Sequence, residues 1–299
     1  MKEPVEFRKV REFGDVISDS VLFIKQNIKP LLKAYLFLCG FFILASMINS
    51  VLIQLQLGNL LESGNAVEYS RGGRPLYMFY NFTLNYVLMF VFIILNYTAI
   101  YLTVLSYISL YIRKGNVAPT VAEVWSYFKY YFWRMLGSGI VMSVFLGLCF
   151  ALCLVPGIYV FPAVTLFYPI LILENAGFSF SFNRAFKLLK DEWWITFATL
   201  LVVFFIYYAC VMVIQVPAVA ISMAGAFMHN NNAFFGTYGV ITAIAQQFSQ
   251  VFMIIPIVAA AMIYFNLVER KESTGLMERI DSLGQNDTKD DHPFVQEEY

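Results

Sequence analysis

The chain has 299 residues, of which 60% are hydrophobic and 13% are charged, and its 20 basic and 20 acidic residues leave no net charge. Soluble proteins carry about 25% charged residues, so this composition excludes an ordinary soluble domain. Because the net charge is zero, we expect no nucleic-acid partner.

The amino-terminal segment is polar and basic. Residues 1–33 contain 7 of the 20 Lys and Arg, and no apolar run precedes Leu31. A cleavable signal peptide places an apolar stretch directly after a short basic region, which this segment does not do. We therefore expect the first spanning helix itself to direct membrane insertion.

Most of the remaining chain falls into long stretches without Asp, Glu, Lys or Arg, namely residues 34–61, 75–112, 135–173 and 193–268. A helix needs roughly 20 apolar residues to cross a hydrocarbon core of about 30 Å, and hydrocarbon offers the backbone no other hydrogen-bond partner. We divide the third stretch at Pro156-Gly157 and the fourth at His229–Asn232, where proline, glycine and polar residues disfavour a continuous apolar helix. The predicted spanning helices are residues 31–57, 82–112, 135–155, 157–173, 194–222 and 238–268.

The fourth predicted span is the shortest and leaves two interpretations open. It contains Pro162 and Pro169. Proline is tolerated in spanning helices, which favours two short or kinked crossings. The alternative is a re-entrant hairpin of the third and fourth helices, and the charge distribution does not distinguish the two.

Basic residues are distributed unequally between the two sides of this predicted topology. Eighteen of the 20 Lys and Arg lie in residues 1–33, 113–134, 175–191 and 269–299. The opposite side holds only Arg71 and Arg74. Cytoplasmic loops are enriched in basic residues, so both termini are predicted to be cytoplasmic. Residues 1–268 would then form one membrane domain, and residues 269–299, with nine acidic and four basic residues, an acidic and partly disordered tail.

Three cytoplasmic segments resemble one another and predict amphipathic helices at the membrane surface, over residues 15–29, 119–133 and 179–193. Aligning their lysines superposes apolar residues at three positions spaced three and four apart, which form one helical face. The aligned positions are Val21, Trp125 and Phe186, then Ile24, Phe128 and Leu189, then Ile28, Phe132 and Trp193. Either a threefold internal repeat or convergence of basic, aromatic loops would produce this pattern.

Residues that favour helix starts precede each of these segments. Asp15 can cap the first helix, and Pro119-Thr120 opens the second. Ser179 or Ser181 can cap the third.

Glu174 is the best candidate for a functional ionisable group, because it closes the fourth predicted span. It can pair with Arg184 or Lys187 on the next predicted helix, which would be a structural role. A gating or coupling carboxylate is the alternative, but that role needs a second buried charge.

The sixth predicted span carries a polar face formed by Gln246, Ser249 and Gln250, with Gln247 beside it. Such residues either line a polar cavity or form hydrogen bonds between helices. Both interpretations stay open at this point.

The sequence predicts no catalytic, cofactor-binding or metal-binding residues. Four cysteines, Cys39, Cys149, Cys153 and Cys210, lie within predicted spans and are expected to be buried apolar residues. Two thiols one turn apart do not complete a zinc site, and His229 and His292 fall on opposite sides of the membrane. Nucleotide-binding and hydrolase motifs are absent.

Two stretches carry a resemblance to a known group. In residues 154–197, a Pro-Gly-aromatic turn is followed by an apolar helix, a Glu and then an Ala/Arg/Lys helix ending in aromatic residues. This pattern resembles uncharacterised bacterial membrane proteins similar to the membrane domain of some glycerophosphodiester phosphodiesterases, and residues 11–32 resemble the amino-terminal segment of that group. The resemblance implies a six-helix protein of the bacterial inner membrane. It does not extend to phosphodiesterase activity, because the catalytic barrel and its metal-binding carboxylates are missing.

The function expected from these features is that of a non-enzymatic membrane scaffold or accessory protein of a bacterial envelope system. Its expected partners are membrane lipids and proteins of an envelope complex. A small-solute or lipid transporter or channel is the alternative, suggested by the Asn- and Gln-rich helix faces and the proline-broken helices. A membrane-embedded lipid enzyme is a third, less favoured possibility that would need catalysis by Glu174.

Overall fold

A computed structural model describes residues 4–62, 75–227 and 231–273, and within these residues the regular structure is helical. The helices are α1 (Phe13–Glu62), α3 (Pro75–Arg113), α4 (Val121–Leu152), α5 (Leu154–Leu173), α6 (Phe178–Leu189), α7 (Trp193–Phe227), α8 (Asn231–Ser249), the 3-10 helix η1 (Gln250–Met253) and α9 (Ile254–Glu272). Six helical stretches of the described residues are long and apolar enough to cross a membrane. The chain is therefore an all-α, multi-pass membrane protein.

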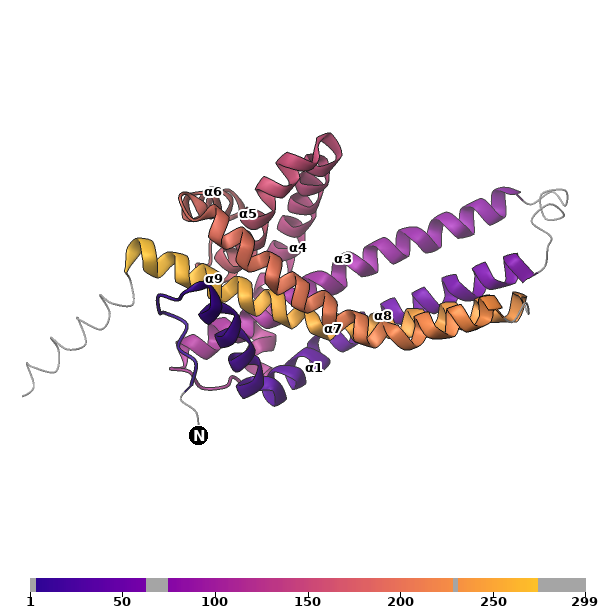
Figure 1. Cartoon of the computed structure of the whole chain (residues 1–299), viewed down its shortest axis with the longest axis horizontal. Helices are drawn as coiled ribbons and strands as arrows, with labels where there is room; N and C mark the ends of the chain where they lie inside the picture. Colours follow the sequence, from indigo (N-terminus) through magenta and orange to yellow (C-terminus); the bar gives the residue numbers. More distant parts are fainter. Residues whose placement is uncertain (1–3, 63–74, 228–230, 274–299) are drawn as a thin grey trace, which may run out of the picture.

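The helix boundaries differ from the sequence prediction at one end of each of two spans, the end predicted to be cytoplasmic. Segment 15–29 is the first part of α1, and segment 119–133 leads directly into the remainder of α4. Only segment 179–193 contains a separate short helix, α6. Pro30 lies inside α1 without ending it, and Figure 1 shows the first, indigo part of α1 running in a different direction from the rest. Proline is a common cause of such a bend.

The reversal between α4 and α5 occurs at Cys153, three residues before the predicted Pro156-Gly157 break. Cys153 is extended, with φ −167° and ψ 149°, while Pro156 and Gly157 belong to the first turn of α5. Gly157 has a packing role there, because a Cβ on it would lie 2.4 Å from Cδ1 of Phe150 on α4. At 20 residues α5 is about 30 Å long, so it is long enough for a crossing. Whether the hairpin crosses or re-enters stays open.

Only one of the predicted helix caps is placed as expected. Thr120 is the N-cap of α4, and its backbone N–H donates to the Glu123 carboxylate at 2.8 Å, one half of a capping box. Asp15 lies inside the first turn of α1. Ser179 and Ser181 lie inside α6, whose N-cap is Gly177.

The molecule has a long arm and a shorter projecting hairpin. Helices α1, α3, α7 and α8 extend together as the arm, and the α4–α5 hairpin leaves in another direction (Figure 1). Side chains near the hairpin tip are largely exposed, among them Leu152 and Val155. In a membrane protein such apolar surface faces lipid.

Helix α9 forms the centre of the fold. It contacts α1, α3, α5, α6 and α7, and every residue from Pro256 to Glu269 is buried. Three of these are the small residues Ala259, Ala260 and Ala261, which allow neighbouring backbones to approach closely. The amino-terminal segment also packs on this centre, where the ring of Phe7 lies 5.6 Å from the ring of Phe265.

The residues aligned in the three amphipathic segments are not buried alike. At the first aligned position Val21 and Trp125 are both more than 40% exposed, whereas at the second position Phe128 and Leu189 are buried and Ile24 is partly buried. At the third position Ile28 is about half exposed. The buried face of the first part of α1 instead includes Val16 and Phe23. All three segments are helical as predicted, while their orientation in the membrane plane and the threefold repeat stay predictions.

Candidate functional site

Glu174 lies where α5 turns into α6, and the local sequence explains this turn. Glu174 is the C-cap of α5, and Asn175 follows with φ 49°. Asparagine tolerates this left-handed conformation better than most residues. The Arg134 guanidinium holds the turn from α4, donating to the Asn175 side-chain oxygen at 2.9 Å. The carboxylate of Glu174 is thereby directed back toward α6 and α9.

A charged cluster formed by Glu174, Arg184, Tyr264 and Glu272 joins α5, α6 and α9. Arg184 Nε donates to Glu174 at 3.0 Å, and its two terminal nitrogens donate to both oxygens of Glu272 at 2.6 and 2.9 Å. The Tyr264 hydroxyl donates to the same Glu174 oxygen at 2.9 Å. The predicted pairing of Glu174 with Arg184 is therefore present, while Lys187 contributes its backbone carbonyl as an acceptor for Lys271 Nζ.

The cluster is only partly screened from solvent. The side chains of Arg184 and Glu174 are 17% and 18% exposed. The hydrogen bonds from Arg184 to Glu272 raise the pKa of the guanidinium above its usual value, so Arg184 is always charged. A polar cavity of about 320 Å³ adjoins the cluster and is also lined by Arg8 and Arg113. The paired groups of this cluster thus link α5, α6 and α9.

The four residues of the predicted polar face in the sixth span form hydrogen bonds with different helices. Gln247 accepts from Ser46 on α1 at 2.9 Å and from Gln250 at 2.8 Å. Gln250 in turn accepts from Asn96 on α3. The remaining two residues bond elsewhere, because Gln246 accepts from Gln215 of α7 at 2.8 Å and Ser249 donates to the Ala245 carbonyl within its own helix.

These amides therefore connect α1, α3, α7 and α8, which matches the interhelical interpretation of the polar face. None of the four predicted residues lines the cavity beside Glu174. The structure thus places the predicted polar face of the sixth span apart from the cavity beside Glu174.

Arg11 is a buried junction that the sequence prediction missed. Its side chain is 1% exposed and its Nε donates to Asp19 at 2.8 Å. Its terminal nitrogens donate to the backbone carbonyls of Glu6, Phe7 and Lys9. The backbone N–H and carbonyl of Arg11 are also hydrogen-bonded. The Arg11 N–H donates to Asn266 at 2.8 Å, and Arg270 donates to the Arg11 carbonyl at 2.8 Å.

Neither the spacing nor the composition near Arg11 indicates that it is buried. It is one of seven basic residues in a segment that reads as a polar cytoplasmic end. Asn266 was recognisable as a polar residue within a span, but its partner is 255 residues away in the sequence. Glu272 and Tyr264 were missed for the same reason, since they lie 88 and 90 residues from Arg184 and Glu174.

The cysteines are free, and they differ in burial. Cys39 is buried, with its sulfur 3.4 Å from the Thr103 hydroxyl, as expected for a core thiol. Cys153 is exposed at the tip of the α4–α5 hairpin, contrary to the expectation of burial, because it forms the reversal itself. The described residues include no cluster of metal-binding side chains. His229 and His292 lie outside the described residues.

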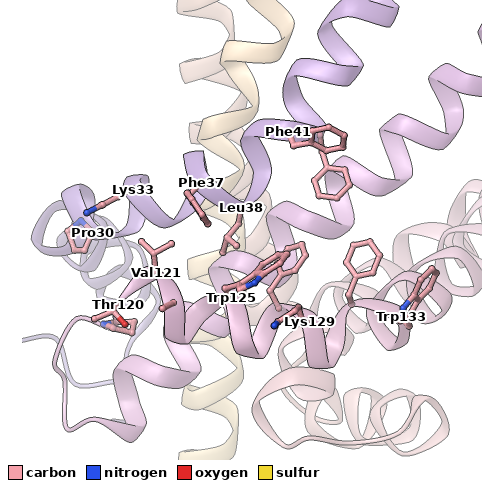
Figure 2. Close-up of a pocket in the computed structure, with 15 residues that line it drawn as sticks. Pro30, Lys33, Phe37, Leu38, Phe41, Thr120, Val121, Trp125, Lys129 and Trp133 are labelled. Atoms are coloured by element: carbon pink, nitrogen blue, oxygen red, sulfur yellow. The ribbon is translucent and has the colours of Figure 1, made fainter.

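A groove of about 1290 Å³ lies between α1 and the start of α4. Its lining runs over residues 30–42 and 119–133. The aromatic lining includes Phe37, Phe41, Trp125, Phe128, Phe132 and Trp133. Lys33 and Lys129 are the charged lining residues, and Lys129 Nζ lies 5.6 Å from the centre of the Trp125 ring. Figure 2 shows α1 above and α4 below, with Phe37 and Leu38 on the side of α1 that faces Trp125 and with Lys33 beside Pro30 at one end of the lining.

The structure thus contains a paired charged cluster, a set of interhelical amides and an apolar groove with two lysines. The resemblance of residues 154–197 and 11–32 to the membrane domain of some glycerophosphodiester phosphodiesterases stays a prediction. Comparison with protein-family models, curated proteins and solved structures finds no match for this chain.

Proposed function

We propose that the protein is a non-enzymatic integral membrane scaffold or accessory protein of a bacterial envelope system. In this proposal it resides in the inner membrane with both termini in the cytoplasm. Its partners are membrane lipids and proteins of the envelope complex. The chain supplies a stable bundle of helices and no chemistry of its own.

The observation that carries this proposal is the pairing within the charged cluster. Glu174 was the best candidate for a gating or catalytic carboxylate, and it is held by Arg184 and Tyr264 at distances of 3.0 and 2.9 Å. Arg184 is held in turn by both oxygens of Glu272. A carboxylate with two fixed partners, placed between three helices, serves to join them.

The amides of the second candidate region support the same role. Gln247 bonds to Ser46, and Gln246 bonds to Gln215, so the polar groups of α8 are used to hold neighbouring helices. Hydrogen bonds of this kind stabilise helix association in membranes by about 0.6–2 kcal/mol each. These amides are therefore accounted for by packing without a solute pathway.

The replacement Glu174→Gln tests the proposal, because it removes the charge and keeps an oxygen that can accept from Tyr264. A scaffold role predicts lower abundance and lower thermal stability, by about 1–2 kcal/mol in unfolding free energy, and no change in ion or solute flux. Arg184→Gln should act in the same direction, and the double variant should lose less than the sum of the two. Stability is measured in detergent micelles, and flux in vesicles with a pH-sensitive dye and with labelled solutes.

Glu192→Gln is the matched control. Glu192 forms a single, longer contact of 3.4 Å with Arg270 at the same end of the bundle, so its loss should change stability by less than about 0.5 kcal/mol. If Glu174→Gln leaves stability intact but abolishes a flux that the wild-type protein supports, the scaffold proposal is wrong. That result would establish the transporter alternative.

A lipid or small-solute transporter or channel is the second candidate function, and the groove between α1 and α4 favours it. The groove is lined mainly by apolar side chains, together with Lys33 and Lys129. A transporter predicts that vesicles containing the protein move a labelled lipid or solute across the bilayer. Absence of movement, together with loss of stability in Glu174→Gln, would favour the scaffold.

A further inference from the structure

The groove between α1 and α4 differs in size and lining from a small-molecule pocket. Its volume of about 1290 Å³ exceeds the roughly 300–1,000 Å³ that is usual for small-molecule sites. The walls are mainly aromatic and aliphatic, and they follow two helices over residues 30–42 and 119–133. An elongated apolar ligand with a small polar end fits such a site.

The polar end of that ligand is specified by the two lysines. Lys33 and Lys129 line the groove, and no Asp or Glu is among its lining residues. Glu123, the nearest acidic residue along α4, pairs with Lys114 at 2.6 Å. Within the described part of the chain, neither groove lysine has a carboxylate in ion-pair contact. The groove therefore offers two uncompensated positive charges to an anion.

The aromatic residues place these charges at the depth of lipid headgroups. Tryptophan prefers the membrane–water interface, and the groove contains Trp125 and Trp133, which are 42% and 77% exposed. Lys129 Nζ lies 5.6 Å from the centre of the Trp125 ring, so its charge is held beside a tryptophan of the groove. Lys33 and Lys129 also belong to the two basic segments predicted to be cytoplasmic, on the side where basic pockets between helices bind anionic headgroups.

We propose that this groove is a binding site for one anionic phospholipid. Its acyl chains follow Phe37 and Phe41 of α1 and Phe132 of α4. Lys33 and Lys129, which lie at separate places along the lining (Figure 2), attract its anionic headgroup. Shape alone would admit any lipid, whereas the two lysines select an anionic headgroup over a zwitterionic one. The charge of the two lysines and the length of the apolar lining together indicate an anionic lipid as the ligand. The site goes beyond the proposed scaffold role, which rests on the charged cluster of α5, α6 and α9 and on the amides of α8.

Quenching of tryptophan fluorescence by brominated lipids tests this site directly. Trp193 and Trp194 lie outside the groove lining, so the full-length Trp193→Phe/Trp194→Phe variant reports on the groove tryptophans alone. In detergent micelles, brominated phosphatidylglycerol should quench at lower concentrations than brominated phosphatidylcholine. Adding Lys33→Gln and Lys129→Gln should weaken phosphatidylglycerol binding by about 30-fold, which corresponds to about 2 kcal/mol, and leave phosphatidylcholine unaffected.

Lys25→Gln with Lys190→Gln is the matched control, because both lysines are exposed and neither lines the groove. It removes the same charge and should change phosphatidylglycerol binding less than twofold. Equal quenching by the two lipids, no effect of the groove substitutions, or an equal loss in the control would each overturn the proposal. So would a second copy of the chain covering the groove, detected as dimers cross-linked through Trp133→Cys. These outcomes concern lipid binding only and would leave the scaffold proposal standing.

Discussion

Replacing Arg11 with leucine should destabilise the protein more than any other single change in its amino-terminal segment. The Arg11 side chain is 1% exposed and binds Asp19 together with three backbone carbonyls of the amino-terminal segment. Leucine fills much of the same volume but satisfies none of these acceptors. The perturbation therefore isolates the polar role of the residue from its packing.

The size of the effect follows from what the substitution leaves behind. Removing one partner of a buried ion pair costs roughly 3–5 kcal/mol, because the remaining charge is desolvated without compensation. Asp19 is 28% exposed, so water relieves part of this cost, and we expect a loss of about 3 kcal/mol. Arg11→Lys should lose about 2 kcal/mol, because a single ammonium cannot reach Asp19 and the carbonyls with the planar fork of a guanidinium.

The assay combines unfolding in detergent micelles with tryptic cleavage under native conditions. When the Arg11 contacts are lost, the segment before α1 should undock, and cleavage after Arg8 and Lys9 should become faster. Lys25→Gln is the control, since this exposed residue should change stability by less than about 0.5 kcal/mol. A loss below 1 kcal/mol for Arg11→Leu, or full stability in Arg11→Lys, would refute the reasoning.

Two further predictions concern topology and the hairpin. A reporter active only in the periplasm should give no signal when fused to residue 299 and a strong signal when inserted near Gly72; the reverse result would mean that the termini are not cytoplasmic. Gly157→Ala should lower the unfolding free energy by about 1 kcal/mol despite the better helix propensity of alanine, because its Cβ would contact the Phe150 ring, and Phe150→Ala should recover that loss. A Gly157→Ala variant more stable than wild type would contradict the contact.

The spanning segments could be predicted from the sequence because the bilayer imposes a simple rule on them. Long stretches without charged residues must be helical in hydrocarbon, and each of the six predicted spans overlaps one of the six apolar helical stretches of the described residues. The ends of α1 and α4 could not be predicted in the same way. Basic residues indicate where the chain leaves the membrane, but α1 and α4 continue as helices through that boundary because their backbone bonds are satisfied on either side.

Local pairs of the candidate site were also predictable, whereas distant ones were not. Glu174 and Arg184 are ten residues apart on adjacent helices, so a short turn brings them together. Glu272 and Asn266 reach their partners only through the packing of α9 against α6 and the amino-terminal segment. The spacing of residues along the sequence does not indicate this packing. The sequence therefore does not distinguish the buried Arg11 from the other basic residues of the amino-terminal segment.

The central position of α9 has a consequence for biosynthesis. The ribosome makes this helix after α1, α3, α5, α6 and α7, yet it supplies the surface on which they all pack. Until Ile254–Glu272 is made, the earlier helices lack this packing surface. The Arg11 N–H then lacks its acceptor Asn266, and the Glu174 carboxylate lacks its donor Tyr264. We therefore expect chains interrupted before Ile254 to be degraded by membrane proteases faster than the 299-residue chain.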